Sequence, residues 1–224
     1  IKNSYKNKIS DCGYCWFELC SRNPCVIDHL EQHLDCVNWV QLSSNPAAIH
    51  ILKQNNGSII HWDRLSNNEN AIELLMENID KINWYLFNLN PNPLAVEYLE
   101  HHPEKIIWQS LSANPAAIHL LEANLDKVNW YFLSKNLNAI HLLKANLDKI
   151  NWDGLVQNPN AIHIIEQNLD KVNWFWLSKN PNATYIIKQN LNKVNWYTLS
   201  QNPNAIHIIK QNLSKVHWDT LSIN

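Results

Sequence analysis

Residues 158–174 read NPNAIHIIEQNLDKVNW, and nearly the same letters return at residues 180–196 (NPNATYIIKQNLNKVNW) and 202–218 (NPNAIHIIKQNLSKVHW). The closing tryptophan of this stretch recurs ten times along the chain at a nearly constant spacing. The ten are Trp16, Trp39, Trp62, Trp84, Trp108, Trp130, Trp152, Trp174, Trp196 and Trp218. A fixed internal period of this length is typical of a repeat protein, in which each unit is stable only when it stacks on its neighbours.

Each unit contains two signals for the start of a helix. The side chain of Asn202 can accept hydrogen bonds from first-turn N–H groups, and the proline after it lacks an N–H that a helix start does not use. Just before the tryptophan, Asn195 can cap a short helix that begins at Trp196, with Val194 packed on Leu199. Each unit is therefore predicted to hold one short helix and one longer helix of about nine residues.

The longer helix of each unit carries an apolar stripe. In the last full unit we expect the buried stripe to be Ala205, Ile206, Ile208 and Ile209. The polar face would then present His207, Lys210 and Gln211. Asn212 is predicted to end the helix in the left-handed conformation, with Leu213 following it.

These signals predict an all-α fold, an α-solenoid of about ten short two-helix repeats. The alternative is a leucine-rich-repeat-like α/β horseshoe, because a period of about 22 residues is usual for that repeat. Leu133 stands where that repeat requires its asparagine, which favours the helical fold. We divide the chain into an N-terminal extension, residues 1–10, and a single repeat domain, residues 11–224, and a sequence that begins at Ile1 is compatible with a segment of a longer protein.

Charge and apolar patterning exclude several classes of function. The formal net charge of −2 provides no global basic field for nucleic acid. No apolar run approaches the length of a membrane span, and the amino terminus lacks the apolar stretch of a secretory signal. All five cysteines lie between Cys12 and Cys36, an odd number that fits a reducing compartment better than a disulfide framework. We therefore expect an intracellular protein with neither a membrane nor a nucleic acid as its partner.

The stretch NPNAIHIIE followed by NLDKVNW resembles the short Asn- and Trp-bearing helical repeats that are expanded in proteins of giant DNA viruses infecting amoebae. The resemblance covers residues 11–224 and is specific to the type of repeat. It implies a viral interaction scaffold in the host cytoplasm or the virion. The early units depart from the pattern with Cys25-Val26 for Asn-Ala, Glu69 for Pro and His102-Pro103 for Asn-Leu, so we expect features particular to this protein there.

A candidate metal site lies near the amino terminus. Cys12 and Cys15, followed by His29 and His33, have a spacing one residue longer than that of a C2H2 zinc finger. Two histidines four residues apart on the longer helix could face one zinc ion. The alternative is that these residues are small buried thiols and capping substitutions of the first unit.

A second candidate is a polar row at the fifth position of the longer helix. The row is His50, Glu73, Glu97, His119, His141, His163, Tyr185 and His207, with Asp28 before them. Stacked helices place these side chains about 10 Å apart, too far for neighbours to share a metal ion. The row is therefore either a stripe that binds a partner or a solvated face.

Lysines are concentrated near the carboxy terminus. Residues 175–224 carry five lysines and one aspartate, a net charge of +4. We hypothesise that Lys188 and Lys210 there meet an acidic surface of a partner protein.

No stretch of the sequence predicts an active site. Neither Ser nor Cys occurs with an assignable His and carboxylate, and the three glycines leave no phosphate-binding loop. We expect the tryptophans to be packed between units, with Trp176, which lies outside the register, as the exposed exception. We therefore predict a non-enzymatic scaffold or adaptor for protein–protein interaction without a cofactor. The alternatives are a virion structural component and a zinc-containing nucleic-acid-binding protein.

Overall fold

The computed structural model describes residues 23, 25, 27–34, 37–54 and 60–221, with no account of the His29, Thr220 and Leu221 side chains. Over these residues the chain consists of helices and turns, without a strand. The predicted all-α fold of repeated helix-turn units is therefore confirmed, and the horseshoe alternative is not favoured.

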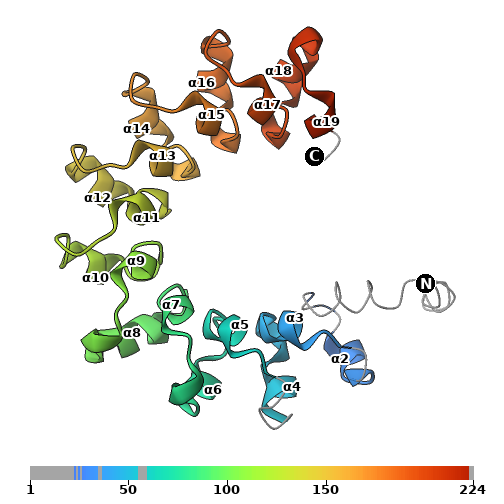
Figure 1. Cartoon of the computed structure of the whole chain (residues 1–224), viewed down its shortest axis with the longest axis vertical. Coiled ribbons are helices and arrows are strands. Elements are labelled where there is room, and N and C mark those ends of the chain that lie inside the picture. Colours follow the sequence, from blue (N-terminus) through green and yellow to red (C-terminus); the bar gives the residue numbers. More distant parts are fainter. Residues whose placement is uncertain (1–22, 24, 26, 35–36, 55–59, 222–224) are drawn as a thin grey trace, which may run out of the picture. The chain divides into compact units, whose positions relative to one another are not determined.

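The chain divides into two compact units, Ile1–Ser110 (unit 1) and Leu111–Asn224 (unit 2). Within each unit, short helices that begin at a tryptophan alternate with longer helices, and each kind stacks on its own side (Figure 1). The predicted N-terminal extension, residues 1–10, lies outside the described part of the chain.

The short helices are α3 (Trp39–Ser43), α5 (Trp62–Ser66), α7 (Trp84–Phe87), α9 (Trp108–Leu111), α11 (Trp130–Lys135), α13 (Trp152–Leu155), α15 (Trp174–Leu177), α17 (Trp196–Leu199) and α19 (Trp218–Leu221). Those of the longer segments are α2 (Ile27–Leu30), α4 (Ile49–Gln54), α6 (Ile72–Met76), α8 (Pro93–His101), α10 (Ile118–Glu122), α12 (Ile140–Ala145), α14 (Ile162–Glu166), α16 (Thr184–Gln189) and α18 (Ile206–Lys210). Turns of 3-10 helix precede α4, α14, α16 and α18, and others follow α6, α8 and α18.

Asparagine starts the helices as predicted. The side chain of Asn195 accepts the N–H of Thr198 at the start of α17. The side chain of Asn202 accepts the N–H of Asn204 at the 3-10 turn Pro203–Ala205, and α18 continues directly from this turn. Both capping predictions are confirmed.

Within each unit, a ladder of buried asparagines joins neighbouring repeats. The Nδ2 group of Asn158 donates to the carbonyls of Ser134 (3.1 Å) and Asn136 (2.9 Å). Its Oδ1 accepts the backbone N–H of Asn160 at 3.0 Å, so one side chain caps its own helix and bonds to the preceding unit. Equivalent bonds are made by Asn68, Asn90, Asn136, Asn180 and Asn202. The ladder fixes the stacking register, because a buried amide without partners is destabilising.

A buried serine at the end of the short helix makes a second cross-repeat bond. Ser134 Oγ donates to the carbonyl of Trp130 and accepts the backbone N–H of Asn151 in the next repeat. Asn88 replaces this serine in unit 1: its amide donates to the carbonyls of Trp84 and Lys105 and accepts the N–H of Ile107 in the next repeat. The position therefore requires one donor and one acceptor rather than serine itself.

Two details of the predicted longer helix are wrong. Asn212 has φ −138° and ψ 41°, so it is not left-handed. Its side-chain amide instead donates to the carbonyl of Ile208, which satisfies a helix-end acceptor without a positive φ. Ile206 is 46% exposed, because it lies at the edge of the face that Ala205, Ile208 and Ile209 form at positions i, i+3 and i+4, and these three are buried as expected.

The tryptophans are less deeply packed than predicted. From Trp39 to Trp196 those in register are half-buried, and in most repeats a lysine of the following repeat lies over the ring. The pairs are Trp62 with Lys81, Trp84 with Lys105, Trp130 with Lys149, Trp152 with Lys171, Trp174 with Lys193, and Trp196 with Lys215. Trp176 is exposed as expected (37%), but Trp218 is more so (59%).

Candidate functional site

The predicted polar row lies on the surface of the longer helices. All eight of its members are exposed: His50, Glu73, Glu97, His119, His141, His163, Tyr185 and His207. Tyr185 is 64% exposed, a large aromatic ring in solvent. Within the described chain, His141, His163, Tyr185 and His207 make no hydrogen bond or ion pair, so these side chains are available to a partner.

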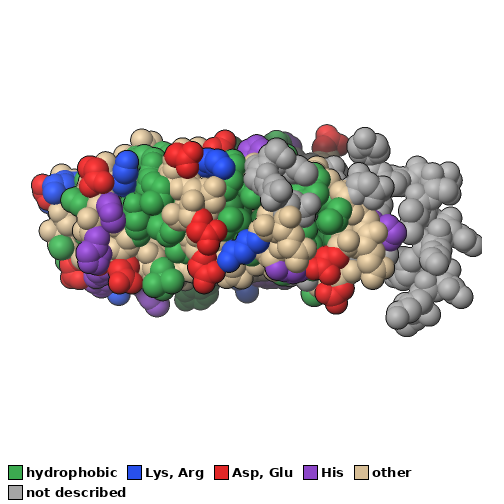
Figure 2. Space-filling view, turned by 90° about the horizontal axis from the view of Figure 1, so that it is seen from below, with side chains coloured by type: hydrophobic (Ala, Val, Ile, Leu, Met, Phe, Trp, Pro, Cys, Tyr) green, Lys and Arg blue, Asp and Glu red, His purple; other side chains and the backbone are tan. Residues whose placement is uncertain are grey.

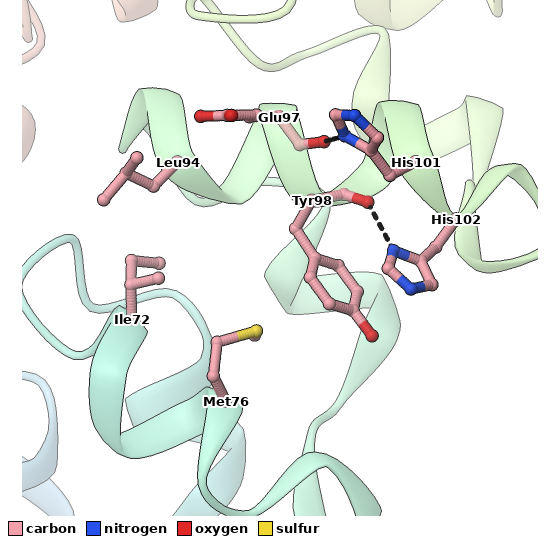
Figure 3. A pocket seen from close by; sticks show the side chains of 7 residues that line it. All are labelled: Ile72, Met76, Leu94, Glu97, Tyr98, His101 and His102. Atoms are coloured by element: carbon pink, nitrogen blue, oxygen red, sulfur yellow. Dashed lines mark hydrogen bonds between the residues drawn. The ribbon is translucent and has the colours of Figure 1, made fainter.

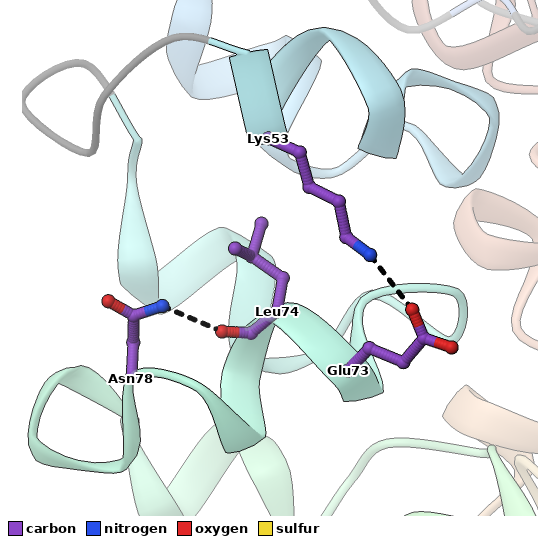
Figure 4. A network of polar contacts seen from close by, with 4 residues as sticks. All are labelled: Lys53, Glu73, Leu74 and Asn78. Atoms are coloured by element: carbon purple, nitrogen blue, oxygen red, sulfur yellow. Dashed lines mark hydrogen bonds and ion pairs between the residues drawn. The ribbon is translucent and has the colours of Figure 1, made fainter.

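In unit 1, part of the row is engaged by neighbouring repeats. Glu73 forms an ion pair with Lys53 of the preceding longer helix at 2.8 Å (Figure 4). The hydrogen bond between them lowers the pKa of Glu73 and raises the pKa of Lys53. The ring Nε2 of His50 contacts the carboxylate of Glu31, and this contact is an ion pair only when the histidine is protonated. Long polar side chains therefore reach between adjacent repeats.

Lys188 and Lys210 are exposed on α16 and α18, beside the row. Neither forms an ion pair within the described residues. Lys193 and Lys215, which contribute to the same positive region, lie over Trp174 and Trp196 instead. Two of the five lysines of this region therefore lie over tryptophan rings, whereas Lys188 and Lys210 are exposed to solvent.

The zinc hypothesis falls mainly on residues that the structure leaves undescribed. Cys12 and Cys15 lie outside the described residues, and nothing is placed for the His29 side chain. Helix α2 ends at Leu30, so His33 does not share a helix with His29 and the predicted helical pairing is wrong. Among the described residues, no group of three or more His, Cys, Asp or Glu is arranged to hold a metal ion.

An apolar groove lies between α6 and α8 in unit 1. Its volume is about 320 Å³, and it opens to solvent. Figure 3 shows Ile72 and Met76 on one side, the Tyr98 ring on the other, and Leu94 at the rim. The lining is completed by Glu97, His101 and His102.

The groove is lined by residues that depart from the repeat. Met76, the only methionine of the chain, stands where the other longer helices carry Glu or Lys. Leu94 belongs to a two-residue insertion that lengthens α8, and Tyr98 replaces a leucine or isoleucine. His102 replaces the helix-ending asparagine, a departure identified from the sequence, and the insertion is visible there as the doubled Asn-Pro of residues 90–93. Comparing every position across repeats would also have identified Met76 and Tyr98.

Exposed aromatic rings mark the short helices of unit 2. Tyr131, Phe175 and Tyr197 directly follow a register tryptophan and are 37%, 40% and 46% exposed. Phe175 packs edge-on against Trp176, with ring centroids 5.0 Å apart. Aromatic residues are enriched in protein interfaces, so this row is a further candidate surface, and it was not predicted from the sequence.

Comparisons with protein-family models, with curated proteins and with solved structures gave no match. The helices that the structure describes include none long and apolar enough to cross a membrane.

Proposed function

We propose that this chain is a non-enzymatic scaffold that binds other proteins through the exposed side chains of its repeats. The proposal rests on a difference between the recurring polar residues of the repeat, which are bonded within the fold, and the exposed positions of the longer helices. The recurring polar residues are bonded to the backbone or cover a tryptophan, as Asn158, Ser134 and Lys171 do. The exposed fifth position of the longer helices varies more: it is histidine in five repeats, glutamate in two (Glu73 and Glu97) and tyrosine in one (Tyr185). A rigid frame with variable exposed positions is what a repeat scaffold uses for recognition.

Unit 2 is the more suitable surface for an acidic partner. It carries ten lysines against seven carboxylates, a formal net charge of +3. Lys188 and Lys210 project beside the row, and exposed aromatic rings are available on the short helices. Charge of this kind raises the rate of association with a surface of opposite sign and is weakened by salt. The resemblance to giant-virus repeats supports an adaptor role in an infected cell.

The test is selection of a displayed library of random peptides on the immobilised full chain. We expect acidic peptides to be enriched and to associate faster at low salt. Lys188→Glu should slow this association about tenfold or less at low salt. Lys179→Glu is the matched control, because Lys179 is also exposed in unit 2, has no ion pair among the described residues, and lies just beyond a short helix.

Two results would contradict the proposal. One is a selection that enriches no peptide above the background of an unrelated immobilised protein. The other is an equal slowing by Lys188→Glu and Lys179→Glu, which would mean that net charge alone, and not the row, determines binding.

A further inference from the structure

The groove between α6 and α8 has a preformed wall. The Tyr98 ring stacks on His102, with centroids 4.0 Å apart, and lies against Trp84 and Phe87 at 6.0 Å each. His102 is itself fixed, since its Nδ1 bonds to the carbonyl of Tyr98 at 2.9 Å (Figure 3). A wall held on several sides requires little ordering when a ligand binds, which favours affinity.

The size and lining of the groove fit a side chain better than a metabolite. About 320 Å³ is at the lower end of the volumes that hold small molecules, and the groove is open. Met76 contributes a flexible, polarisable thioether, a group that adapts to differently shaped apolar ligands. Leu94 is 57% exposed, so it can be covered by an arriving side chain. The arrangement resembles the small apolar pocket that receives an anchor residue at a protein interface.

The rim of the groove offers hydrogen-bond acceptors. A carbonyl oxygen can only accept, so His101 must donate from Nδ1 to the carbonyl of Glu97, and His102 must donate from Nδ1 to that of Tyr98. In the neutral ring, Nε2 of each histidine is then an acceptor. The carboxylate of Glu97 is exposed and has no partner among the described residues.

The segment that forms the groove carries a strongly negative net charge, and Glu97 is the carboxylate in its lining. Residues 60–110 carry eight carboxylates and three cations, a formal net charge of −5. The carboxylates are Asp63, Glu69, Glu73, Glu77, Asp80, Glu97, Glu100 and Glu104. Two of the three cations, Lys81 and Lys105, lie over tryptophan rings. Figure 2, a view from the side of α6 and α8, shows acidic and histidine side chains beside strips of hydrophobic atoms. A ligand that donates hydrogen bonds and carries positive charge complements this rim.

We propose that this groove binds a basic segment of a partner protein, with one bulky apolar side chain in contact with Met76, Leu94 and Tyr98 and with flanking Lys or Arg side chains at the acidic rim. The inference rests on the proposed scaffold function and names the partner class for one of its surfaces. It differs from the acidic partner proposed for unit 2, because the two units carry opposite charge.

The test measures fluorescence anisotropy of a short fluorescein-labelled peptide of lysines around one central tryptophan, added to the full chain. Two matched peptides replace the tryptophan with alanine or the lysines with glutamate. We expect each replacement to weaken binding about tenfold or more, and salt to weaken binding of the parent peptide.

Two variants locate the bound peptide. Met76→Gln removes apolar lining without a change of charge, at a position that is polar in other repeats and therefore compatible with folding. Leu94→Ser removes the exposed rim residue. Each should weaken binding of the tryptophan peptide about tenfold. The control is Leu137→Ser, which alters a leucine of comparable exposure (46%) in unit 2. Circular dichroism of all three should match the unaltered chain.

The outcomes separate this inference from the proposed function. If the peptide binds equally to Met76→Gln, Leu94→Ser and the unaltered chain, the groove inference fails while the scaffold proposal stands on its own selection experiment. If tryptophan and alanine peptides bind equally, contact is only electrostatic and the inference also fails. If sedimentation shows a dimer that Met76→Gln dissociates, the occupant is a second copy of the chain, which overturns the basic partner segment.

Discussion

Unit 2 repeats itself almost without variation, whereas unit 1 departs from the same pattern in many places. The register tryptophans are evenly spaced from Trp108 onward, and every longer step between two of them lies before Trp108. Unit 1 also has a net charge of −5, against +3 for unit 2. Both units use the same asparagine bonds. Because the backbone bonds are shared, the departures are not required by the fold, and several of them meet at the groove between α6 and α8.

The shared bonds and the departures from the repeat can be tested separately. Asparagine and serine bond mainly to backbone, so their positions can recur while exposed side chains change. One recurring bond is missing at His61, which occupies the cap position of α5 in place of asparagine and makes no side-chain cap bond. A repeat can therefore lose one recurring bond if the rest of its ladder remains.

The largest effect is expected for the buried asparagine ladder. Asn158→Ala removes one cap bond and two bonds to the preceding repeat, and leaves buried backbone groups without partners. We expect a loss of about 2–4 kcal/mol in the free energy of unfolding, measured by urea titration. The exposed Gln167→Ala should change it by less than about 0.5 kcal/mol.

The same substitution tests whether the ladder supports both units. Asn90→Ala in unit 1 should cost as much as Asn158→Ala, because Asn90 makes the same three bonds. A harmless Asn90→Ala beside a damaging Asn158→Ala would show that unit 1 is stabilised in another way, and the comparison between units would have to be abandoned.

The next effect concerns the close approach of α11 and α13 in unit 2. A Cβ atom at Gly154 would lie 2.6 Å from the carbonyl oxygen of Tyr131, which belongs to the backbone and cannot turn away. Gly154→Ala should therefore destabilise the chain by about 1–3 kcal/mol through overpacking. Thr198→Ala is the control at the equivalent position of α17, where a side chain is already present. A thermal melt in which Gly154→Ala is as stable as the unaltered chain would contradict this packing.

A smaller effect is expected at the serine position. Ser134→Ala removes the acceptor of the Asn151 N–H and the donor to the Trp130 carbonyl, at an expected loss of about 1–2 kcal/mol. Asn88→Ser in unit 1 should cost only about 1 kcal/mol in the same urea titration, because serine keeps the donor to Trp84 and the acceptor for Ile107 and loses the bond to the Lys105 carbonyl. A loss well above that of Ser134→Ala would mean that the longer amide is needed in unit 1 for a reason beyond these three bonds.

One repeat of the natural sequence already lacks this serine. Val156 occupies the serine position, and the following cap residue Asn173 is exposed, whereas the caps Asn151 and Asn195 are half-buried. Asn173 also accepts from Phe175, two residues on, instead of three. Loss of the serine therefore has a visible local consequence while the repeat remains folded.

The fold could be predicted because its signals are local. Caps at Asn195 and Asn202 depend on a few neighbouring residues, so the sequence is enough to place them. The ladder bond of Asn158, the lysine over each tryptophan and the exposure of Ile206 depend on the rotation between stacked repeats, which no single repeat specifies. The groove was missed for the same reason: Met76 and Tyr98 lie on different repeats, and only the stacking brings them together.

The smallest effect is expected for the lysines that lie over register tryptophans. Lys171 Nζ lies 5.2 Å from the centre of the Trp152 ring, and the lysine is exposed. Because water competes for the ammonium group, Lys171→Ala should lower the free energy of unfolding by only about 0.5–1 kcal/mol. Lys105→Ala in unit 1 should have a similar effect, since Lys105 Nζ lies 5.0 Å from the centre of the Trp84 ring.

The control for this prediction is Lys144→Ala, which removes an exposed lysine that lies over no ring among the described residues. Quenching of the tryptophan fluorescence of the chain offers a second measurement, because removal of Lys171 exposes one more ring, that of Trp152, to solvent and quencher. If Lys171→Ala and Lys144→Ala have equal effects on both stability and quenching, the lysines only solvate the surface, and the recurrence of this residue needs another explanation.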